Sequence, residues 1–176
     1  MKVIKALTLV GIMFLAVATS AQTKKENKVI NDAKKAKRDL VKSDAGLKRF
    51  FNNSAGYVIF PNVGKGGFII GGASGNGAVY ENGNLIGTAG LKKLNVGLQA
   101  GGQAIIEVIF FETAVDLERF KEGKFAFAAE ASAVAVKSGI AVNAKYKDGV
   151  AVFALPKAGL MADASVGGQK FSYRPF

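Results

Sequence analysis

The sequence predicts an α+β protein, mainly antiparallel β, in which roughly 8–10 short strands form one strongly curled or barrel-like sheet. Three observations lead to this prediction. Short apolar runs alternate with tight turns over the carboxy-terminal two thirds of the chain. Glycine pairs interrupt these runs, as glycines do where strands bend or backbones approach closely. A basic amphipathic helix is predicted before the strands, and a short middle helix among them.

The first residues have the three-part layout of a secretory signal peptide. Two lysines form a positive region, an apolar run covers residues 6–17, and small residues follow at 18–21. The apolar run is shorter than the ~20 residues of a membrane-spanning helix, which favours a cleaved leader over an uncleaved anchor. We expect cleavage after Ala21, or alternatively after Ala18, and export to a bacterial periplasm. The predicted segments are the leader at 1–21, a basic helical segment at 22–51 and a glycine-rich β region at 52–176, the last two forming one domain.

Neither cysteine nor histidine occurs in the 176 residues. Thiolate nucleophiles, imidazole bases, disulfides and Cys/His zinc sites are therefore excluded, and with them the commonest catalytic groups. The acids Glu107, Glu112, Glu130 and Asp163 have no neighbouring base, so we interpret them as surface or turn carboxylates. We expect a protein that is not an enzyme and that has no cofactor and no metal site.

Positive charge is concentrated directly after the leader. Loss of the leader's two lysines lowers the net charge from +11 to +9, and +6 of this lies in residues 24–51, which have ten basic and four acidic residues. Apolar residues recur there at steps of three and four, which predicts a helix. They are Val29, Ala33, Ala36, Leu40, Leu47 and Phe51. Ser43 and Asp44 are predicted to end this helix and to cap a shorter one that extends through Phe51.

A helix docked by this apolar stripe still presents its lysines to an anionic surface. Each Lys or Arg near an anionic bilayer contributes about 1 kcal/mol, so half of the six net charges gives roughly 3 kcal/mol of salt-sensitive attachment. Phe50 and Phe51 are either wedges that strengthen this attachment or core residues. The predicted lipid-binding residues are Lys34, Lys35, Lys37, Arg38, Lys42, Lys48, Arg49, Phe50 and Phe51. We expect no specific nucleic-acid partner, because no basic motif interleaved with aromatic residues is present.

Strands are predicted over most of the remaining chain. Their ranges are 57–60, 67–73, 77–80, 85–91, 96–101, 105–112, 125–136, 140–146, 150–155, 160–166 and 170–173. Hairpin turns are predicted at Asn82-Gly83 and at Lys147-Asp148-Gly149. The glycine pairs at 66–67, 71–72, 101–102 and 167–168 are interpreted as bends of the curled sheet, because the sequence around them lacks a P-loop.

The short helix inside the strand region has local start and stop signals. Thr113 is predicted to cap it, with Asp116 at its third position. The helix is predicted to extend through Glu122, and Gly123 to stop it.

A longer stretch resembles the signature of the SYLF domain family. In that family an A-G-hydrophobic-F-P segment leads to K-G-G-F and hydrophobic-G-G, as residues 55–72 do in AGYVIFPNVGKGGFIIGG. The likeness continues at 75–80, 96–103 and 159–168. It departs at 87–91, where GTAGL has neither the Trp nor the Pro of the family's Gly-Trp-Ser-x-Pro segment.

The resemblance implies a lipid-binding domain. In eukaryotic members it implies phosphoinositide binding and actin association, with membrane contact through a basic amphipathic helix at the amino terminus. An exported protein would not meet actin, so only binding to an anionic phospholipid membrane surface carries over to this chain. No protein partner is indicated by the sequence.

The sequence thus predicts a non-enzymatic peripheral lipid-binding protein, exported and membrane-associated. It would contact anionic phospholipid through its basic amino-terminal helix. The alternative is an exported carrier or scaffold that holds an apolar ligand within the curled sheet. Salt-sensitive binding to anionic vesicles favours the first function, and salt-insensitive lipid uptake favours the second.

Overall fold

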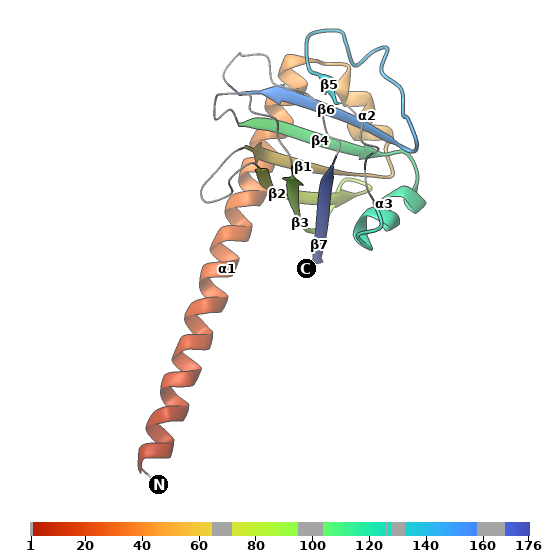
Figure 1. Cartoon of the computed structure of the whole chain (residues 1–176). Helices are drawn as coiled ribbons and strands as arrows, with labels where there is room; N and C mark the ends of the chain where they lie inside the picture. Colours follow the sequence, from red (N-terminus) through yellow and green to blue (C-terminus); the bar gives the residue numbers. More distant parts are fainter. Residues whose placement is uncertain (1, 65–71, 95–103, 126, 128–132, 158–167) are drawn as a thin grey trace.

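The computed structural model describes residues 2–64, 72–94, 104–125, 127, 133–157 and 168–176. These ranges form three helices and a seven-stranded sheet, an α+β arrangement (Figure 1). The helices are α1 (Lys2–Ser43), α2 (Leu47–Asn53) and α3 (Ala114–Lys121). The strands are β1 (Gly56–Val63), β2 (Gly72–Glu81), β3 (Asn84–Leu94), β4 (Ile105–Phe111), β5 (Val134–Ala135), β6 (Val150–Pro156) and β7 (Gln169–Pro175).

The sheet is open, so the prediction of a strongly curled or barrel-like sheet is wrong. The strand order is β5-β6-β4-β1-β2-β3-β7, which leaves β5 and β7 at opposite edges in the described ranges. All neighbours are antiparallel except β5 and β6, which are parallel. Helices cover the two faces in place of a closing sheet: α1 and α2 pack on one face and α3 on the other. The carrier hypothesis therefore loses the curled sheet on which it depended.

Strand β1 explains why both faces need a cover. Seven of its eight residues are buried, because successive side chains point to opposite faces and both faces are packed. Tyr57 and Ile59 join the core shared with α1 and α2, whereas Val58 and Phe60 join the core shared with α3. A continuous apolar run is typical of a strand that is buried on both faces.

Glycines inside the strands make room for neighbouring side chains, whereas none of the glycine pairs interpreted as bends lies wholly within the described residues. At Gly77 an added β-carbon would lie 2.7 Å from Cδ1 of Phe60, and at Gly56 it would lie 2.7 Å from Cδ2 of Leu117. The glycine pairs 66–67 and 101–102 lie outside the described residues. So do the predicted strands 96–101 and 160–166 and most of 67–73.

The start of α3 confirms its sequence signals. Asp116 donates its backbone N–H to Oγ1 of Thr113 (3.3 Å), and Oδ2 of Asp116 accepts the N–H of Thr113 (3.2 Å). These reciprocal bonds form a capping box, and the helix ends at Lys121 with Glu122 as its cap. Gly123 follows with a left-handed φ of 69°.

Both predicted turns are also confirmed. Asn82 and Gly83 join β2 to β3 with φ values of 49° and 80°. Asp148 and Gly149 precede β6 with φ values of 52° and 80°. Left-handed φ values in both residues of a pair match the Asn-Gly and Asp-Gly signals.

Two predicted strands fail in the described residues. Residues 140–146 form turns and irregular loop, and among the described residues of the predicted strand 125–136, which are 125, 127 and 133–136, only Val134–Ala135 is strand. The failure at 140–146 has a physical cause. Side chains of the basic helical segment form hydrogen bonds with backbone groups that pairing with a neighbouring strand would require.

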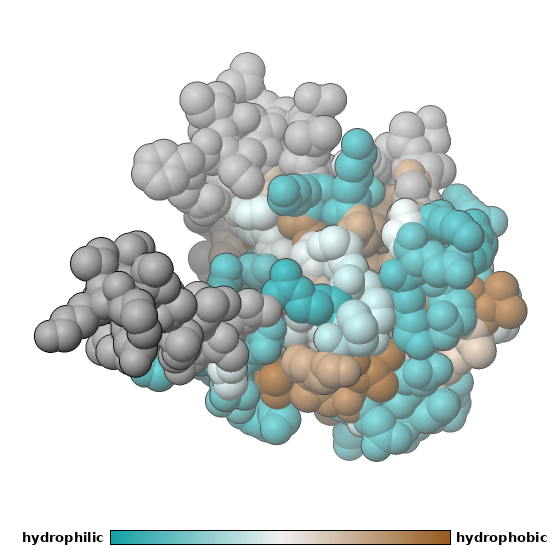
Figure 2. Space-filling view, turned by 90° about the horizontal axis from the view of Figure 1, so that it is seen from below, coloured by the Kyte–Doolittle hydropathy of each residue, from teal (hydrophilic) through white to brown (hydrophobic). Residues whose placement is uncertain are grey.

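Helix α1 extends beyond the sheet at its amino-terminal end (Figure 1). That end includes the predicted leader, whose removal stays a prediction. No helix in the described part of the chain is both long enough and apolar enough to cross a bilayer. Viewed from below, the surface is mostly hydrophilic with a hydrophobic patch near its centre (Figure 2).

Candidate functional site

Helix α1 docks on the sheet through the predicted apolar stripe. Ala33, Ala36 and Leu40 are at most 2% exposed, and Leu47 and Phe51 of α2 belong to the same core. Since this stripe faces the sheet, the basic residues beside it are divided between two flanks of the helix.

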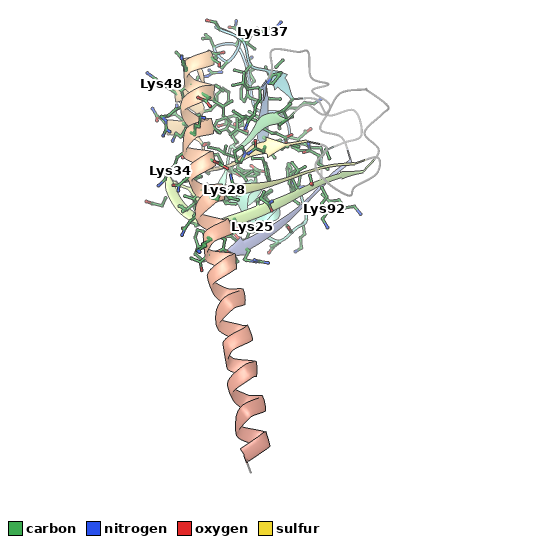
Figure 3. The ribbon with its side chains drawn as sticks, turned by 90° about the vertical axis from the view of Figure 1, so that its left-hand side faces the viewer. Lys25, Lys28, Lys34, Lys48, Lys92 and Lys137 are labelled. Atoms are coloured by element: carbon green, nitrogen blue, oxygen red, sulfur yellow. The ribbon has the colours of Figure 1, made fainter. Side chains whose placement is uncertain are left out.

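One flank of α1 forms an open groove of about 610 Å³ with α2. Val41 and Phe51 give the groove its apolar part, and Asn52 also lines it. Its basic residues are Lys34, Lys37, Arg38, Lys42 and Lys48. We call these eight residues the basic groove. Figure 3 shows Lys34 and Lys48 on the same side of α1.

The five cations of the basic groove have no acidic partner in the described residues. No described carboxylate oxygen lies within 4.0 Å of their nitrogens. The ion pairs of α1 lie nearer its amino-terminal end, between Lys28 and Asp32 (3.2 Å) and between Glu26 and Arg174 (3.8 Å). Cations gathered without counter-charge repel one another, so an anion bound in the groove would stabilise them.

Lys37 is the cation most enclosed by the protein. Its Nζ donates to the Tyr57 hydroxyl at 3.0 Å and lies 4.5 Å from the ring centroid of Phe51. Burial lowers the pKa of Lys37. The Tyr57 ring stacks on that of Tyr80, and burial together with the nearby Tyr57 raises the pKa of Tyr80 to about 12. The Tyr57 hydroxyl and the Phe51 ring are neutral groups, which favours an anionic ligand beside the Lys37 ammonium.

The opposite flank of α1 carries Lys35. It lines a separate cavity of about 440 Å³ together with Asp32, Asp39 and Lys157. Charges of both signs therefore surround Lys35, and the structure does not bring it together with the basic groove.

Arg49 and the two phenylalanines have structural contacts. Arg49 Nη2 donates to the backbone carbonyl of Ala141 at 2.9 Å and also to that of Ala144. Phe50 is 3% exposed and Phe51 is 8% exposed, and both pack in the core. They lie in the structure as core residues, the second of the two interpretations that the sequence left open.

Asp44 is not the cap of α2 that the sequence predicted, because Gly46 precedes that helix without a side-chain cap hydrogen bond, and Asp44 has another role. Its side chain is buried, and its oxygens accept the backbone N–H of Gly46 at 2.9 Å and that of Ala141 at 2.7 Å. Burial alone would raise the pKa of Asp44, but backbone N–H groups, first of all those of Ala141 and Gly46, outweigh it and lower the pKa. Asp44 thereby holds the loop at 137–144 against the junction of α1 and α2. No local signal reveals this, because Ala141 is 97 residues away in sequence.

The buried carboxylate of Glu107 corrects a further expectation. We interpreted it as a surface or turn residue, but it is 0% exposed and accepts a hydrogen bond from Gln169 Nε2 at 3.0 Å. Within the described residues, no three acidic side chains gather where they would hold a metal ion.

Comparisons with known proteins concern mainly the carboxy-terminal half. Residues 92–175 match the family model Ysc84, described as "Las17-binding protein actin regulator". The protein "Beta cell expansion factor A" of Aeromonas veronii is 31% identical over 83 residues, which are 46% of this chain and 32% of that protein. The chain thus matches about a third of the length of this curated relative. The resemblance to the SYLF family is confirmed for residues 92–175, which match the Ysc84 (SYLF) family model.

Proposed function

We propose that this protein is a non-enzymatic peripheral lipid-binding protein that contacts anionic phospholipid through the basic groove. One observation carries the proposal: five cations gather around Val41 and Phe51. In the described residues, no carboxylate forms an ion pair with any of them. Cations suit a lipid phosphate, and the apolar residues suit the hydrocarbon next to it. The protein would act after export, at the surface of a membrane facing the periplasm.

The basic groove lies outside the residues that match the family model. It is formed by residues 34–52, whereas the match covers 92–175. The proposal is therefore supported by the geometry of α1 and α2, and by the basic helix that the SYLF resemblance implies. The actin regulation in the family description belongs to the family model and is not part of the proposal.

The expected attachment is weak and depends on salt. Five cations at about 1 kcal/mol each, with roughly half of them at the lipid surface, give about 2–3 kcal/mol. Raising the ionic strength from about 0.1 M to about 1 M shortens the Debye length from about 10 Å to about 3 Å, which should release the protein.

Vesicle sedimentation with a charge-matched control tests the proposal. The groove variant carries Lys34→Glu, Arg38→Glu and Lys42→Glu, and the control carries Lys92→Glu, Arg119→Glu and Lys170→Glu, all at exposed positions. Wild type and control should bind vesicles containing phosphatidylglycerol and release them at high salt, whereas the groove variant should not bind. Equal losses in the two variants would show that net charge alone attracts the protein. Equal binding to neutral phosphatidylcholine vesicles would also refute the proposal.

A further inference from the structure

We infer that the loop at residues 137–144 is a second membrane-contact element, which inserts Ile140 and Val142 into an anionic bilayer beside the basic groove. The inference rests on the proposed function. It adds exposed aliphatic side chains to the groove, whose own apolar lining includes Phe51, a residue that is only 8% exposed. We call this loop the apolar tip.

The apolar tip displays two aliphatic residues to solvent. Ile140 is 44% exposed and Val142 is 59% exposed, while Ala141 between them is 1% exposed and packs in the core. The other large hydrophobic residues exposed in the described chain are Val115, on α3, and Phe176, at the carboxyl end. Among the described residues, the apolar tip is therefore the loop that exposes two large hydrophobic side chains.

The backbone of the apolar tip is held in place from both sides. Asp44 accepts the N–H of Ala141, and Arg49 donates to the carbonyls of Ala141 and Ala144. Within the loop, the N–H groups of Ile140 and Asn143 donate to the carbonyls of Lys137 and Ile140, at 3.2 and 3.3 Å.

These bonds matter because an unsatisfied backbone group is costly in hydrocarbon. A loop in which several backbone groups are already paired enters the bilayer edge at a smaller cost. Being fixed before binding, it also loses little conformational freedom on insertion.

Basic residues surround the apolar tip. Lys137, Lys145 and Lys147 flank it in sequence, with Asp148 as the neighbouring acid, and all four are exposed. Lys48 of the basic groove directly precedes Arg49, which binds the tip. Figure 3 shows Lys48 and Lys137 at the same end of the molecule, away from the projecting part of α1. Apolar side chains on a segment rich in exposed cations suit the boundary between anionic head groups and acyl chains.

Single tryptophans give a direct test because the chain contains none. In the Val142→Trp variant, phosphatidylglycerol vesicles should shift the emission to shorter wavelength, and quenchers attached to the lipid acyl chains should reduce it. The Val115→Trp variant is the matched control, since Val115 is 68% exposed but lies on α3, across the sheet. Its emission should not change. Identical responses in the two variants would overturn the inference.

Affinity provides the second measurement. The double variant Ile140→Ser and Val142→Ser should bind the same vesicles about tenfold more weakly, because less apolar surface leaves water. Val115→Ser should bind as wild type does, and thermal melting should show that both variants are folded. If wild type itself fails to bind, the proposed function and the inference both fall. If wild type binds with the expected salt dependence but the double variant binds equally well, only the inference falls.

Discussion

Replacing Asp44 with alanine should detach the loop at 137–144 from the junction of α1 and α2. The variant loses two charge-assisted hydrogen bonds, to the N–H groups of Gly46 (2.9 Å) and Ala141 (2.7 Å), at a side chain that is 2% exposed. Each such bond contributes about 1.5–3 kcal/mol, and water will satisfy part of what is lost. We therefore expect the free energy of unfolding to fall by about 2–4 kcal/mol, which for a chain of this size lowers the Tm by roughly 5–15 °C.

The dependence on pH identifies the carboxylate as the cause. Because the folded pKa of Asp44 is lowered, its contribution to stability is present above the unfolded pKa of about 3.9 and is lost as the pH falls through the folded value. Urea unfolding of wild type and Asp44→Asn should therefore differ most near neutral pH and converge in acid. Asp32→Asn, which removes a surface ion pair, is the control and should change stability by less than about 1 kcal/mol. Equal stability of wild type and Asp44→Asn at neutral pH, or a gap that widens in acid, would refute the reasoning.

Three further substitutions test the groove, the sheet and α3. Lys37→Met should reduce binding to phosphatidylglycerol vesicles about fivefold in sedimentation, whereas Lys35→Met, on the other flank, should reduce it less. Gly77→Ala should lower the free energy of unfolding in urea by about 1–3 kcal/mol, because its methyl group would collide with Phe60. An unchanged unfolding midpoint would contradict this. Thr113→Ala should cost about 1 kcal/mol and lower the Tm by a few degrees in calorimetry, and Thr113→Ser should restore most of the loss.

Features encoded by neighbouring residues were predictable from the sequence. The capping box of α3 needs only Thr113 and Asp116, and the turn before β3 needs only Asn82 and Gly83. The apolar stripe of α1 depends on helical spacing alone. The prediction of a curled sheet was wrong because a glycine in a strand indicates close approach of another group but does not identify that group. At Gly56 it is a leucine of α3, from a distant part of the chain.

The helical segment that carries the candidate site was predictable from the sequence. Which of its side chains share one surface was not. The sequence placed the cations in one helical segment, but the flank that each cation of α1 occupies depends on how the apolar stripe meets the sheet. Lys34 and Lys35 are adjacent in sequence, yet they line different cavities. Arg49 has the charge of a lipid-binding residue and instead binds carbonyls of a loop 92 and 95 residues away. Such long-range partners leave no local pattern in a single sequence.

The strand order has a consequence for how the chain assembles. Residues 92–175 supply β4, β6 and β5 on one side of the sheet and β7 on the other, while β1, β2 and nearly all of β3 lie between them. The described strands of an excised fragment of those residues would therefore be the two flanks of the sheet without its centre. Because β7 follows every other described strand in sequence yet pairs with β3, the described sheet cannot be completed until β7 has been made.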